Sequence, residues 1–170
     1  MRAIPITVAA LASALLLTAC NDSGGGSDKN SSACGFGEVG VQVGPASTAP
    51  AAGDTGEVPV SITNQSKPCT LDGFPTVKLR AGSTDVGLSA QKGAKAQKLK
   101  LAKGDAASFT ITYVRGKAGD KLSLDATTVV IALPGSTADK SYKWSYGPVR
   151  GKGGAGNPEA SVGAFQQSGD

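Results

Sequence analysis

The sequence contains no histidine. Without histidine there can be no Ser-His-Asp or Cys-His catalytic site, and the commonest general base is missing. Methionine occurs only at Met1, so a soft copper site built from His, Cys or Met is excluded as well. We therefore expect a protein that is not an enzyme and that needs no cofactor.

Clustered carboxylates are also missing. A calcium loop needs closely spaced acidic residues, and the sequence has no Asp-x-Asn/Asp-x-Asn/Asp-Gly pattern. We expect no metal site, because the aspartates are scattered along the chain, at Asp54, Asp72, Asp85, Asp105, Asp120 and Asp125.

Charge is low. The chain has 17 Lys and Arg residues against 13 Asp and Glu residues, a formal net charge of +4. A charge this small allows weak attraction to anionic surfaces. It lacks the concentrated basic face of a nucleic-acid-binding protein, so we expect no nucleic-acid partner.

Two short motifs match catalytic or nucleotide-binding patterns without their context. Ser89-Ala-Gln-Lys92 fits the Ser-x-x-Lys of penicillin-recognising enzymes, but the partner motifs Ser-Asp-Asn and Lys-Thr-Gly are absent. Gly151-Lys-Gly-Gly-Ala-Gly156 spells Gly-x-Gly-x-x-Gly outside any strand-to-helix unit. We interpret the second motif as a flexible, low-complexity loop.

The one long apolar stretch lies at the N-terminus, from Ala3 to Leu17 after Met1 and Arg2. It has the length of a signal-peptide core and is short for a membrane span. It ends in Leu17-Thr-Ala-Cys20, which resembles a bacterial lipobox. The resemblance implies removal of residues 1–19 as a lipoprotein signal peptide and a diacylglycerol thioether on Cys20. The alternative is an ordinary signal peptide cut after Ala19, with a free thiol on Cys20.

The segment 20–33 is expected to be a disordered tether. It is rich in Ser, Gly, Asp and Asn and has no large apolar side chain. Its r.m.s. reach is about 20 Å. Two acyl chains suffice for stable anchoring, so we expect the domain 34–168 to sit on the extracytoplasmic face of the cell membrane, attached through Cys20.

The chain has three cysteines, so one must stay outside any intrachain disulfide. If Cys20 carries lipid, Cys34 and Cys69 can pair in an oxidising compartment. The alternative is two buried free thiols.

Short runs of alternating apolar and polar residues recur after the tether, separated by Gly, Pro, Asn or Asp. Such runs predict strands, and many of them predict an all-β antiparallel sandwich of the immunoglobulin-like kind. No segment after the signal peptide has a helical period. The predicted strands are 39–43, 58–63, 77–80, 99–101, 109–113, 127–133, 142–146 and 160–165.

The most distinctive stretch is Asn64-Gln-Ser-Lys-Pro-Cys-Thr-Leu-Asp-Gly-Phe-Pro75. Together with Cys34, the Gly104 turn and Pro134-Gly135, it resembles the domain of unknown function 4232, found in secreted proteins and lipoproteins of high-GC Gram-positive bacteria. The resemblance covers roughly residues 34–167. It implies an immunoglobulin-like sandwich and no particular activity. One departure is that members often carry a second cysteine pair in the C-terminal half, where this chain has none.

Every residue of this motif has a structural interpretation. Asn64 and Ser66 suit a turn, because their side chains can bond nearby backbone groups. Cys69 would tie the loop to the start of the domain, Gly73 allows a backbone conformation barred to other residues, and Phe74 can fill the end of the sandwich. We prefer this interpretation to a ligand-binding role.

An aromatic row is the first candidate binding surface. Alternation would place Tyr142, Trp144 and Tyr146 on one face of a strand. If exposed, they would form a flat platform for a sugar ring or a peptide. If buried, they are core, and we favour the core because a chain this poor in aromatics needs its large side chains inside.

A lysine run is the second candidate. It could contact anionic wall polymers or lipid headgroups. We favour a plainer interpretation, in which lysines protect an exposed sheet edge from aggregation. The run consists of Lys92, Lys95, Lys98, Lys100 and Lys103.

These observations predict a lipid-anchored, non-enzymatic binding or interaction module whose partner is a cell-wall polymer or an envelope protein. One rival is a small envelope hydrolase that uses Asp, Glu, Lys or Ser, which predicts paired carboxylates or a Ser–Lys pair in one cleft. Another rival is a purely structural spacer, which predicts no pocket and no exposed aromatic patch.

Overall fold

Strand β9 (Ala106–Val114) shows how the sequence pattern sets the architecture. In this computed structural model, which describes residues 32–168, β9 alternates strictly between buried and half-buried positions. Phe109, Ile111 and Tyr113 point into the core, while Ser108, Thr110 and Thr112 lie on the opposite face. The predicted strand 109–113 is confirmed and is longer at both ends.

Within residues 32–168 the chain forms strands and no helix, so the all-β prediction is confirmed. No helix that could cross a membrane occurs in this part of the chain. The strands are β1 Ser32–Ala33, β2 Val39–Val43, β3 Thr55–Asn64, β4 Cys69–Gly73, β5 Thr76–Ala81, β6 Thr84–Gly87, β7 Ser89–Ala90, β8 Gln97–Leu101, β9 Ala106–Val114, β10 Ser123–Leu124, β11 Thr128–Ala132, β12 Asp139–Lys143, β13 Val149–Arg150, β14 Ala160–Val162 and β15 Gln166–Gln167.

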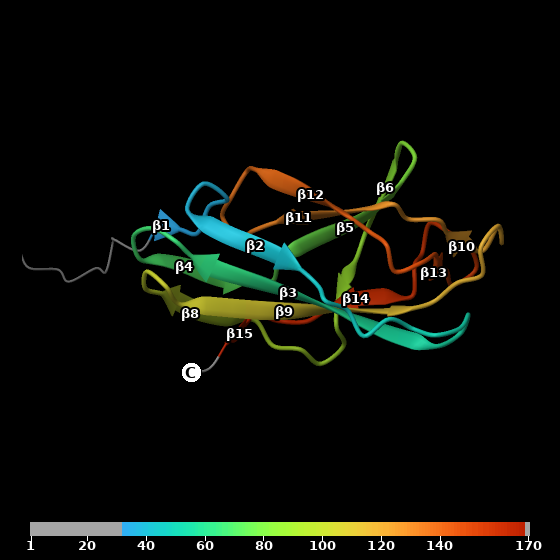
Figure 1. Cartoon of the computed structure of the whole chain (residues 1–170), viewed down its shortest axis with the longest axis horizontal. Helices are drawn as coiled ribbons and strands as arrows, with labels where there is room; N and C mark the ends of the chain where they lie inside the picture. Colours follow the sequence, from blue (N-terminus) through green and yellow to red (C-terminus); the bar gives the residue numbers. More distant parts are fainter. Residues whose placement is uncertain (1–31, 169–170) are drawn as a thin grey trace, which may run out of the picture.

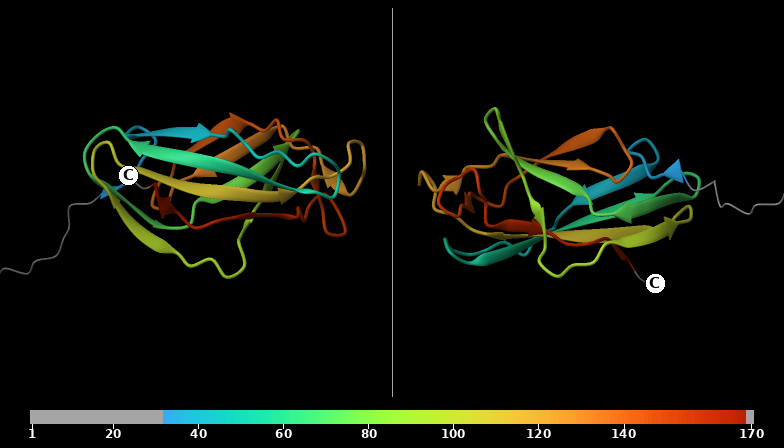
Figure 2. Two further views of the ribbon diagram at one scale, coloured as in Figure 1. Left: turned by 60° about the horizontal axis from the view of Figure 1, so that its bottom comes forward. Right: turned by 180° about the vertical axis from the view of Figure 1, so that it is seen from behind.

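Two large sheets dominate the molecule. The six-stranded sheet has the order β2-β3-β9-β14-β7, with β15 also paired to β9, and the four-stranded sheet has the order β12-β11-β5-β6. In Figure 1 the strands β12, β11 and β5 lie above β3 and β9. Figure 2 shows from two further sides that β3 and β9 run together along the length of the domain. The smaller sheets are β1-β4-β8 and β10-β13.

The sheets are mixed, which corrects the expectation of a purely antiparallel fold. Most neighbouring strands are antiparallel, but β1 pairs with β4 in parallel and β7 pairs with β14 in parallel. Both parallel partners are two-residue strands at the edge of a sheet. The alternation pattern could not reveal them, because two residues are too few to show a period.

One core joins the two large sheets. The inward residues of β3, Val58, Val60 and Ile62, are fully buried and belong to the same apolar cluster as Val129 and Ile131 of β11. Since burying one such side chain contributes roughly 1.5–3 kcal/mol, the alternating strands are held mainly by this shared core.

The predicted signal peptide 1–19 and Cys20 lie outside the described residues, as do residues 21–31 of the predicted tether. The description begins at β1, which pairs with the start of β4. Beside this pairing, Cys34 and Cys69 form the predicted disulfide, with Cα atoms 4.9 Å apart and both side chains fully buried. The alternative of two free thiols is wrong.

Asn64 of the distinctive motif is a buried hydrogen-bonding centre. Its side-chain Oδ1 accepts a hydrogen bond from the backbone N–H of Ser66 at 3.1 Å, as expected for a turn. Its Nδ2 donates to the carbonyl oxygens of Lys67 at 2.9 Å, Leu101 at 3.0 Å and Ala102 at 3.2 Å. One side chain therefore joins the end of β3 to the end of β8.

Gly56 of β3 gives a first test of the packing. A Cβ atom at Gly56 would lie 2.5 Å from Cε1 of Tyr113 and 2.8 Å from the backbone nitrogen of Ala49. Gly56→Ala is therefore expected to lower the free energy of unfolding by about 2 kcal/mol, because the buried Tyr113 ring must move. Urea unfolding followed by tryptophan fluorescence measures the change.

The matched control is Gly37→Ala, where a Cβ atom would meet nothing within 4 Å. This variant should unfold with the wild-type midpoint. Equal stability of the Gly56 and Gly37 variants would contradict the close approach of β3 to the Tyr113 ring.

Candidate functional site: a polar groove on the six-stranded sheet

The aromatic row is not a surface platform. Strand β12 ends at Lys143, so the predicted strand 142–146 is displaced toward the N-terminus by three residues. Trp144 follows β12, is only 3% exposed and belongs to the core. Its indole Nε1 donates a hydrogen bond to the carbonyl oxygen of Gly147 at 2.8 Å. Trp144 is therefore a core residue, which is the alternative that we favoured from the sequence.

The two tyrosines of the row are half-buried beside this core. Trp144 stacks edge-to-face on Tyr146, with ring centroids 4.9 Å apart, and on Tyr113 at 5.2 Å. Burial raises the pKa values of both Tyr142 and Tyr146. The Tyr113 hydroxyl donates to the carbonyl oxygen of Tyr146 at 3.0 Å and accepts from the amide of Ala49 at 3.3 Å. These aromatic side chains close the end of the core.

The lysine run is divided between several elements. All five lysines are exposed, but Lys92 and Lys95 lie between β7 and β8, and Lys103 lies in the turn before β9. Lys98 and Lys100 lie on β8, the edge strand of the sheet β1-β4-β8. Lys98 is also paired with Asp72 at 3.3 Å. Only Lys98 and Lys100 therefore lie on a sheet edge, where charged side chains discourage pairing with another chain.

The outer face of the six-stranded sheet carries rows of polar side chains. The strand registers place Thr112 of β9 opposite Glu57 of β3 on one side and Ser161 of β14 on the other, and Ser161 opposite Ser89 of β7. Directly opposite residues point to the same face of a sheet. A further row joins Ser61 of β3, Ser108 of β9 and Gln166 of β15.

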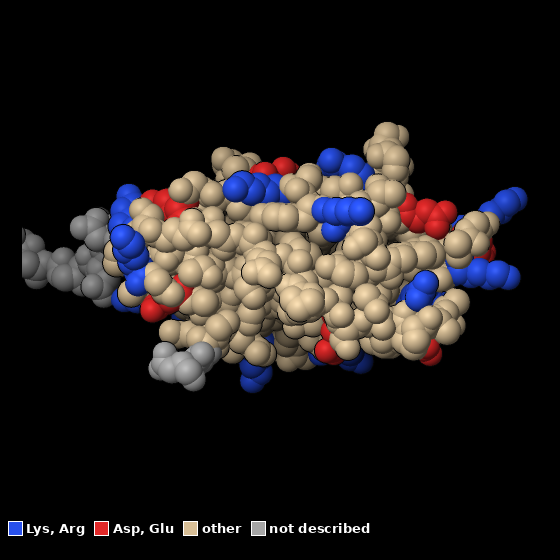
Figure 3. All heavy atoms as spheres, in the orientation of Figure 1, with Lys and Arg blue, Asp and Glu red and all other residues tan. Residues whose placement is uncertain are grey.

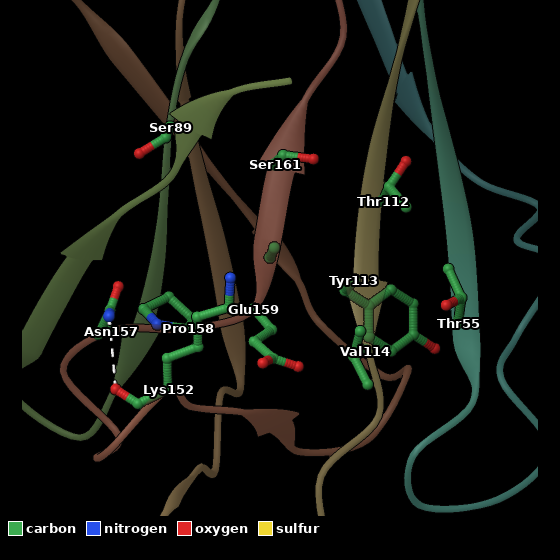
Figure 4. A pocket seen from close by; sticks show the side chains of 11 residues that line it. Thr55, Ser89, Thr112, Tyr113, Val114, Lys152, Asn157, Pro158, Glu159 and Ser161 are labelled. Carbon is green, nitrogen blue, oxygen red and sulfur yellow. Dashed lines mark hydrogen bonds between the residues drawn. The ribbon is translucent and has the colours of Figure 1, made fainter. Parts of the chain in front are cut away.

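This face is hollowed into a groove made of two adjoining hollows that share Thr112. The first has a volume of about 470 Å³ and lies between β9, β14, β7 and the loop before β14. Figure 4 shows Ser161, Ser89 and Thr112 on the strands around it, with Asn157 and Glu159 on the loop side. The second hollow has a volume of about 400 Å³, and its lining includes Ser108, Thr110, Gln91, Gln97, Gln166, Glu57 and Lys95.

The loop 151–158 forms one wall of the groove. The Gly-x-Gly-x-x-Gly stretch lies in this loop, and hydrogen bonds hold it in place. The amide of Lys152 donates to the carbonyl oxygen of Asn157 at 2.8 Å, and the amide of Glu159 donates to that of Arg150 at 2.6 Å. A Cβ atom at Gly151 would overlap the carbonyl oxygen of Gly154, so the tight turn requires glycine at this position. The motif shapes this wall of the groove, and within the described residues no helix follows it as it would in a nucleotide-binding strand-to-helix unit.

The chemistry of the groove is that of hydroxyl and amide groups. Each hollow contains one carboxylate and one ammonium group, Glu159 and Lys152 in the first and Glu57 and Lys95 in the second. Glu159 is further neutralised by Arg150, whose Nε donates to Oε2 at 2.5 Å. The groove and its rim therefore carry only a small net positive charge, and the hydroxyl and amide groups offer hydrogen bonds in both directions.

Comparison with known proteins decides the family. The family model described as a domain of unknown function, DUF4232, matches residues 34–166. The chain belongs to the DUF4232 family. The match begins at Cys34, the first disulfide cysteine, and ends within β15. No curated protein and no solved structure matches the chain.

Membership of DUF4232 confirms the resemblance drawn from the Asn64–Pro75 motif and leaves the activity open. The motif residues of this DUF4232 domain are the structural ones described above: Asn64 fixes two turns, Cys69 forms the disulfide and Gly73 has a positive φ of 108°. None of these three residues lines the groove.

Catalytic groups are poorly represented in the groove of this DUF4232 domain. Glu57 and Glu159 lie in separate hollows, and Glu159 is already paired with Arg150. Within residues 32–168 no three Cys, His, Asp or Glu side chains gather into a group that could hold a metal ion. Ser89 of the Ser-x-x-Lys match lies on the two-residue strand β7.

No pattern in the sequence indicated the groove. The alternation of Ser108, Thr110 and Thr112 was visible as a strand pattern, but polar residues on the outer face of a strand are ordinary. The groove arises only when the registers bring Ser161 and Ser89 beside Thr112. These residues are far apart in the chain, so no local pattern could have indicated their proximity.

Proposed function

We propose that this DUF4232 domain is a non-enzymatic binding module for a component of the cell envelope, anchored to the outer face of the cell membrane through a lipid on Cys20. The lipobox-like stretch before Cys20 supports the anchor. The Cys34–Cys69 disulfide supports an oxidising compartment, where such bonds persist.

We further infer an immunoglobulin-like sandwich as the fold. The two large sheets share one core, and residues of both alternate between inward and outward positions, as in that architecture. The mixed edges formed by β1 and β7 are additions at the margins of this arrangement.

The observation that carries the proposal is the groove around Thr112. A spacer domain has no need of two adjoining hollows of about 470 and 400 Å³. The small net charge and the many hydroxyl and amide groups favour a polar ligand that is bound by hydrogen bonds, such as a wall glycan or its peptide stems.

A hydrolase remains the rival from another class. A glycosidase of the common kind uses two carboxyl groups on opposite sides of the scissile bond. Here the first hollow contains Glu159, held by Arg150, and the second contains Glu57. The first hollow also contains Ser89, Ser161 and Lys152, but no hydrogen bond joins either serine hydroxyl to Lys152 within residues 32–168. The separated carboxylates and the unpaired serines favour binding over hydrolysis.

Cosedimentation with purified cell-wall sacculi tests the proposal, using the chain from Asn21 onward. Thr112→Tyr is expected to weaken binding at least about tenfold, or 1.4 kcal/mol, because the new ring would occupy both hollows at their shared residue. Tyrosine favours strands, so β9 should be preserved. The control is Ser141→Tyr on β12, an exposed strand position on the other sheet.

The salt dependence separates the groove from the lysines. Binding through hydrogen bonds in the groove should persist at high salt, whereas binding through exposed lysines is screened beyond about 10 Å at 0.1 M salt. Equal binding by the Thr112 and Ser141 variants would contradict a groove ligand. Absence of binding at either salt concentration would exclude the wall and leave an envelope protein as the partner.

A further inference from the structure

The exposed edges of the sheets differ in how well they are protected. An unprotected edge strand presents unpaired N–H and C=O groups, and proteins usually protect such edges with charged residues or by keeping the strand short. Within residues 32–168, β1 and β7 have two residues each, and three other edge strands carry charged residues: Asp139, Lys140 and Lys143 on β12, Lys98 and Lys100 on β8, and Asp85 on β6.

Strand β2 is the exception among these described edges. Its five residues read Val-Gly-Val-Gln-Val, without a charge or a proline, and β3 is its neighbour on one side only. In Figure 3 the surface over β2 is free of blue and red side chains. It therefore lacks the usual protection against pairing with another strand.

Two hydrogen bonds fix which backbone groups of β2 face outward. Gln65 donates to the carbonyl oxygen of Glu38 at 2.9 Å, and Gly44 donates to that of Pro59 at 2.8 Å. In an antiparallel ladder every second residue bonds to the partner strand. The even-numbered residues 38–44 therefore face β3, and the backbone groups of Val39, Val41 and Val43 point away from it.

One of these outward groups is already used, because the amide of Val39 donates to the carbonyl oxygen of Gly35 at 3.2 Å. Among residues 32–168, the other backbone hydrogen bonds of β2 are those to β3. The groups left for another strand are the carbonyl of Val39, both groups of Val41 and both groups of Val43.

We propose that two copies of this chain pair edge to edge through β2, in antiparallel register about a twofold axis at Val41. The sequence of β2 is nearly symmetric about Val41, so Val39 would lie opposite Val43 of the second copy and Gly40 opposite Gln42. The Val41 amides and carbonyls exchange hydrogen bonds, and each Val43 amide reaches the Val39 carbonyl of the other copy. The amide of Val39 already donates to Gly35, so it would not take part in the hydrogen bonds between the two copies.

The side chains fit this register on both faces of the sheet. On the outer face, a hollow of about 270 Å³ beside Gly40 is lined by Gln42, Ser61, Thr63 and Gln65. Gln42 of the second copy would lie opposite Gly40, beside the amide of Gln65, whose Nε2 lies 2.6 Å from the position that a Cβ atom at Gly40 would take. On the inner face, Val41 and Val43 are half-buried, and pairing covers more of their apolar surface.

The same features favour a second copy over an unrelated partner. In a twofold pair each side chain meets its own kind or its symmetry mate, so a charged edge would repel itself. Strand β2 has no charge to repel, and its alternating Val residues are self-complementary. The pairing does not depend on the anchor, although confinement of both copies to one membrane would raise their effective concentration.

Concentration-dependent amide hydrogen exchange tests the pairing on the wild-type sequence. The chain from Asn21 onward is used, because residues 32–168 contain every described strand, the disulfide and the shared core. Between micromolar and millimolar concentrations, the Val41 and Val43 amides should become at least about tenfold more protected. The Gly40 and Gln42 amides, already bonded to β3, should not change.

A pair of variants at Val41 provides the second measurement, by sedimentation. Val41→Pro removes the outward N–H and places a ring on the free edge, where proline is tolerated in a strand. It should remain monomeric, whereas Val41→Ile, which keeps the N–H, should associate like the wild type. If Val41→Pro fails to fold, the exchange measurement on the wild type still decides.

Three results would overturn the proposal. The first is a wild-type chain that stays monomeric at millimolar concentration. The second is a dimer whose Val41 and Val43 amides exchange as in the monomer, which would place the interface elsewhere. The third is a folded Val41→Pro variant that associates as strongly as Val41→Ile. None of these results bears on sacculus binding, so this proposal and the groove are tested separately.

Discussion

Replacing both Cys34 and Cys69 with alanine is expected to lower the free energy of unfolding by about 4 kcal/mol. The two cysteines are 35 residues apart, so the bond closes a long loop in the unfolded chain. Removing the disulfide raises the conformational entropy of the unfolded chain, and this gain in entropy accounts for the expected loss of stability. Because small domains are stable by only about 5–15 kcal/mol, the variant should be close to unfolding at 37 °C.

Urea unfolding with and without the disulfide measures this effect. The two sulfur atoms are fully buried, so their loss also removes packing from the core. A double valine variant restores apolar volume at both positions and serves as the control, since it lacks only the covalent link. If both double variants lose several kcal/mol, the link is responsible. A double valine variant as stable as the wild type would show that the cost lies in packing and contradict the entropic account.

The elements that could be predicted from the sequence are those whose residues alternate over a long stretch. Val58–Ile62 and Phe109–Tyr113 alternate over enough positions to indicate both the strand and its buried face. The cysteine pairing could also be predicted, because only two of the three cysteines lie in the domain. The strands follow from a local alternation of residues and the disulfide from the number of cysteines, and both can be read directly from a sequence.

Predictions that depended on where a strand stops were less accurate. Tyr142, Trp144 and Tyr146 alternate, but β12 ends before Trp144, and the indole turns into the core to donate to Gly147. A buried indole N–H needs a partner, and this one is a loop carbonyl that no pattern could indicate. The groove depends on registers between four strands, and registers are set by the whole sheet.

The motif around Asn64 lies between these two cases. Its turn-forming character could be read from the residues, and the bond to the Ser66 amide bears this out. The contacts from Asn64 to Leu101 and Ala102 span 37 and 38 residues of the chain and could not be predicted. Because of these long-range contacts Asn64 is more than a local turn residue, and its replacement should strongly affect stability.

Asn64→Asp is expected to lower the free energy of unfolding by about 3 kcal/mol or more at pH 7. The side chain is fully buried, and its Nδ2 faces the carbonyl oxygens of Lys67, Leu101 and Ala102. An aspartate of the same shape would replace these donated bonds with a negative charge directed at three acceptor oxygens. Asn64→Ala should cost a similar amount, because it leaves the same carbonyls without their donor.

The pH dependence distinguishes the two variants. Burial among carbonyl oxygens raises the pKa of the introduced carboxyl group in the folded state above its unfolded value of about 4. Below pH 4 both states are protonated, and the penalty is smallest. As pH rises from there, the unfolded state ionises first, so stability falls until pH passes the folded-state pKa, above which the loss is constant. Asn64→Ala has no titrating group at this position, so its difference from the wild type should not vary with pH.

Urea unfolding of the wild type and both variants from pH 4 to pH 7 measures this contrast. A pH-independent difference for Asn64→Asp would mean that the carboxyl group has reached water and that the end of β3 can separate from the end of β8.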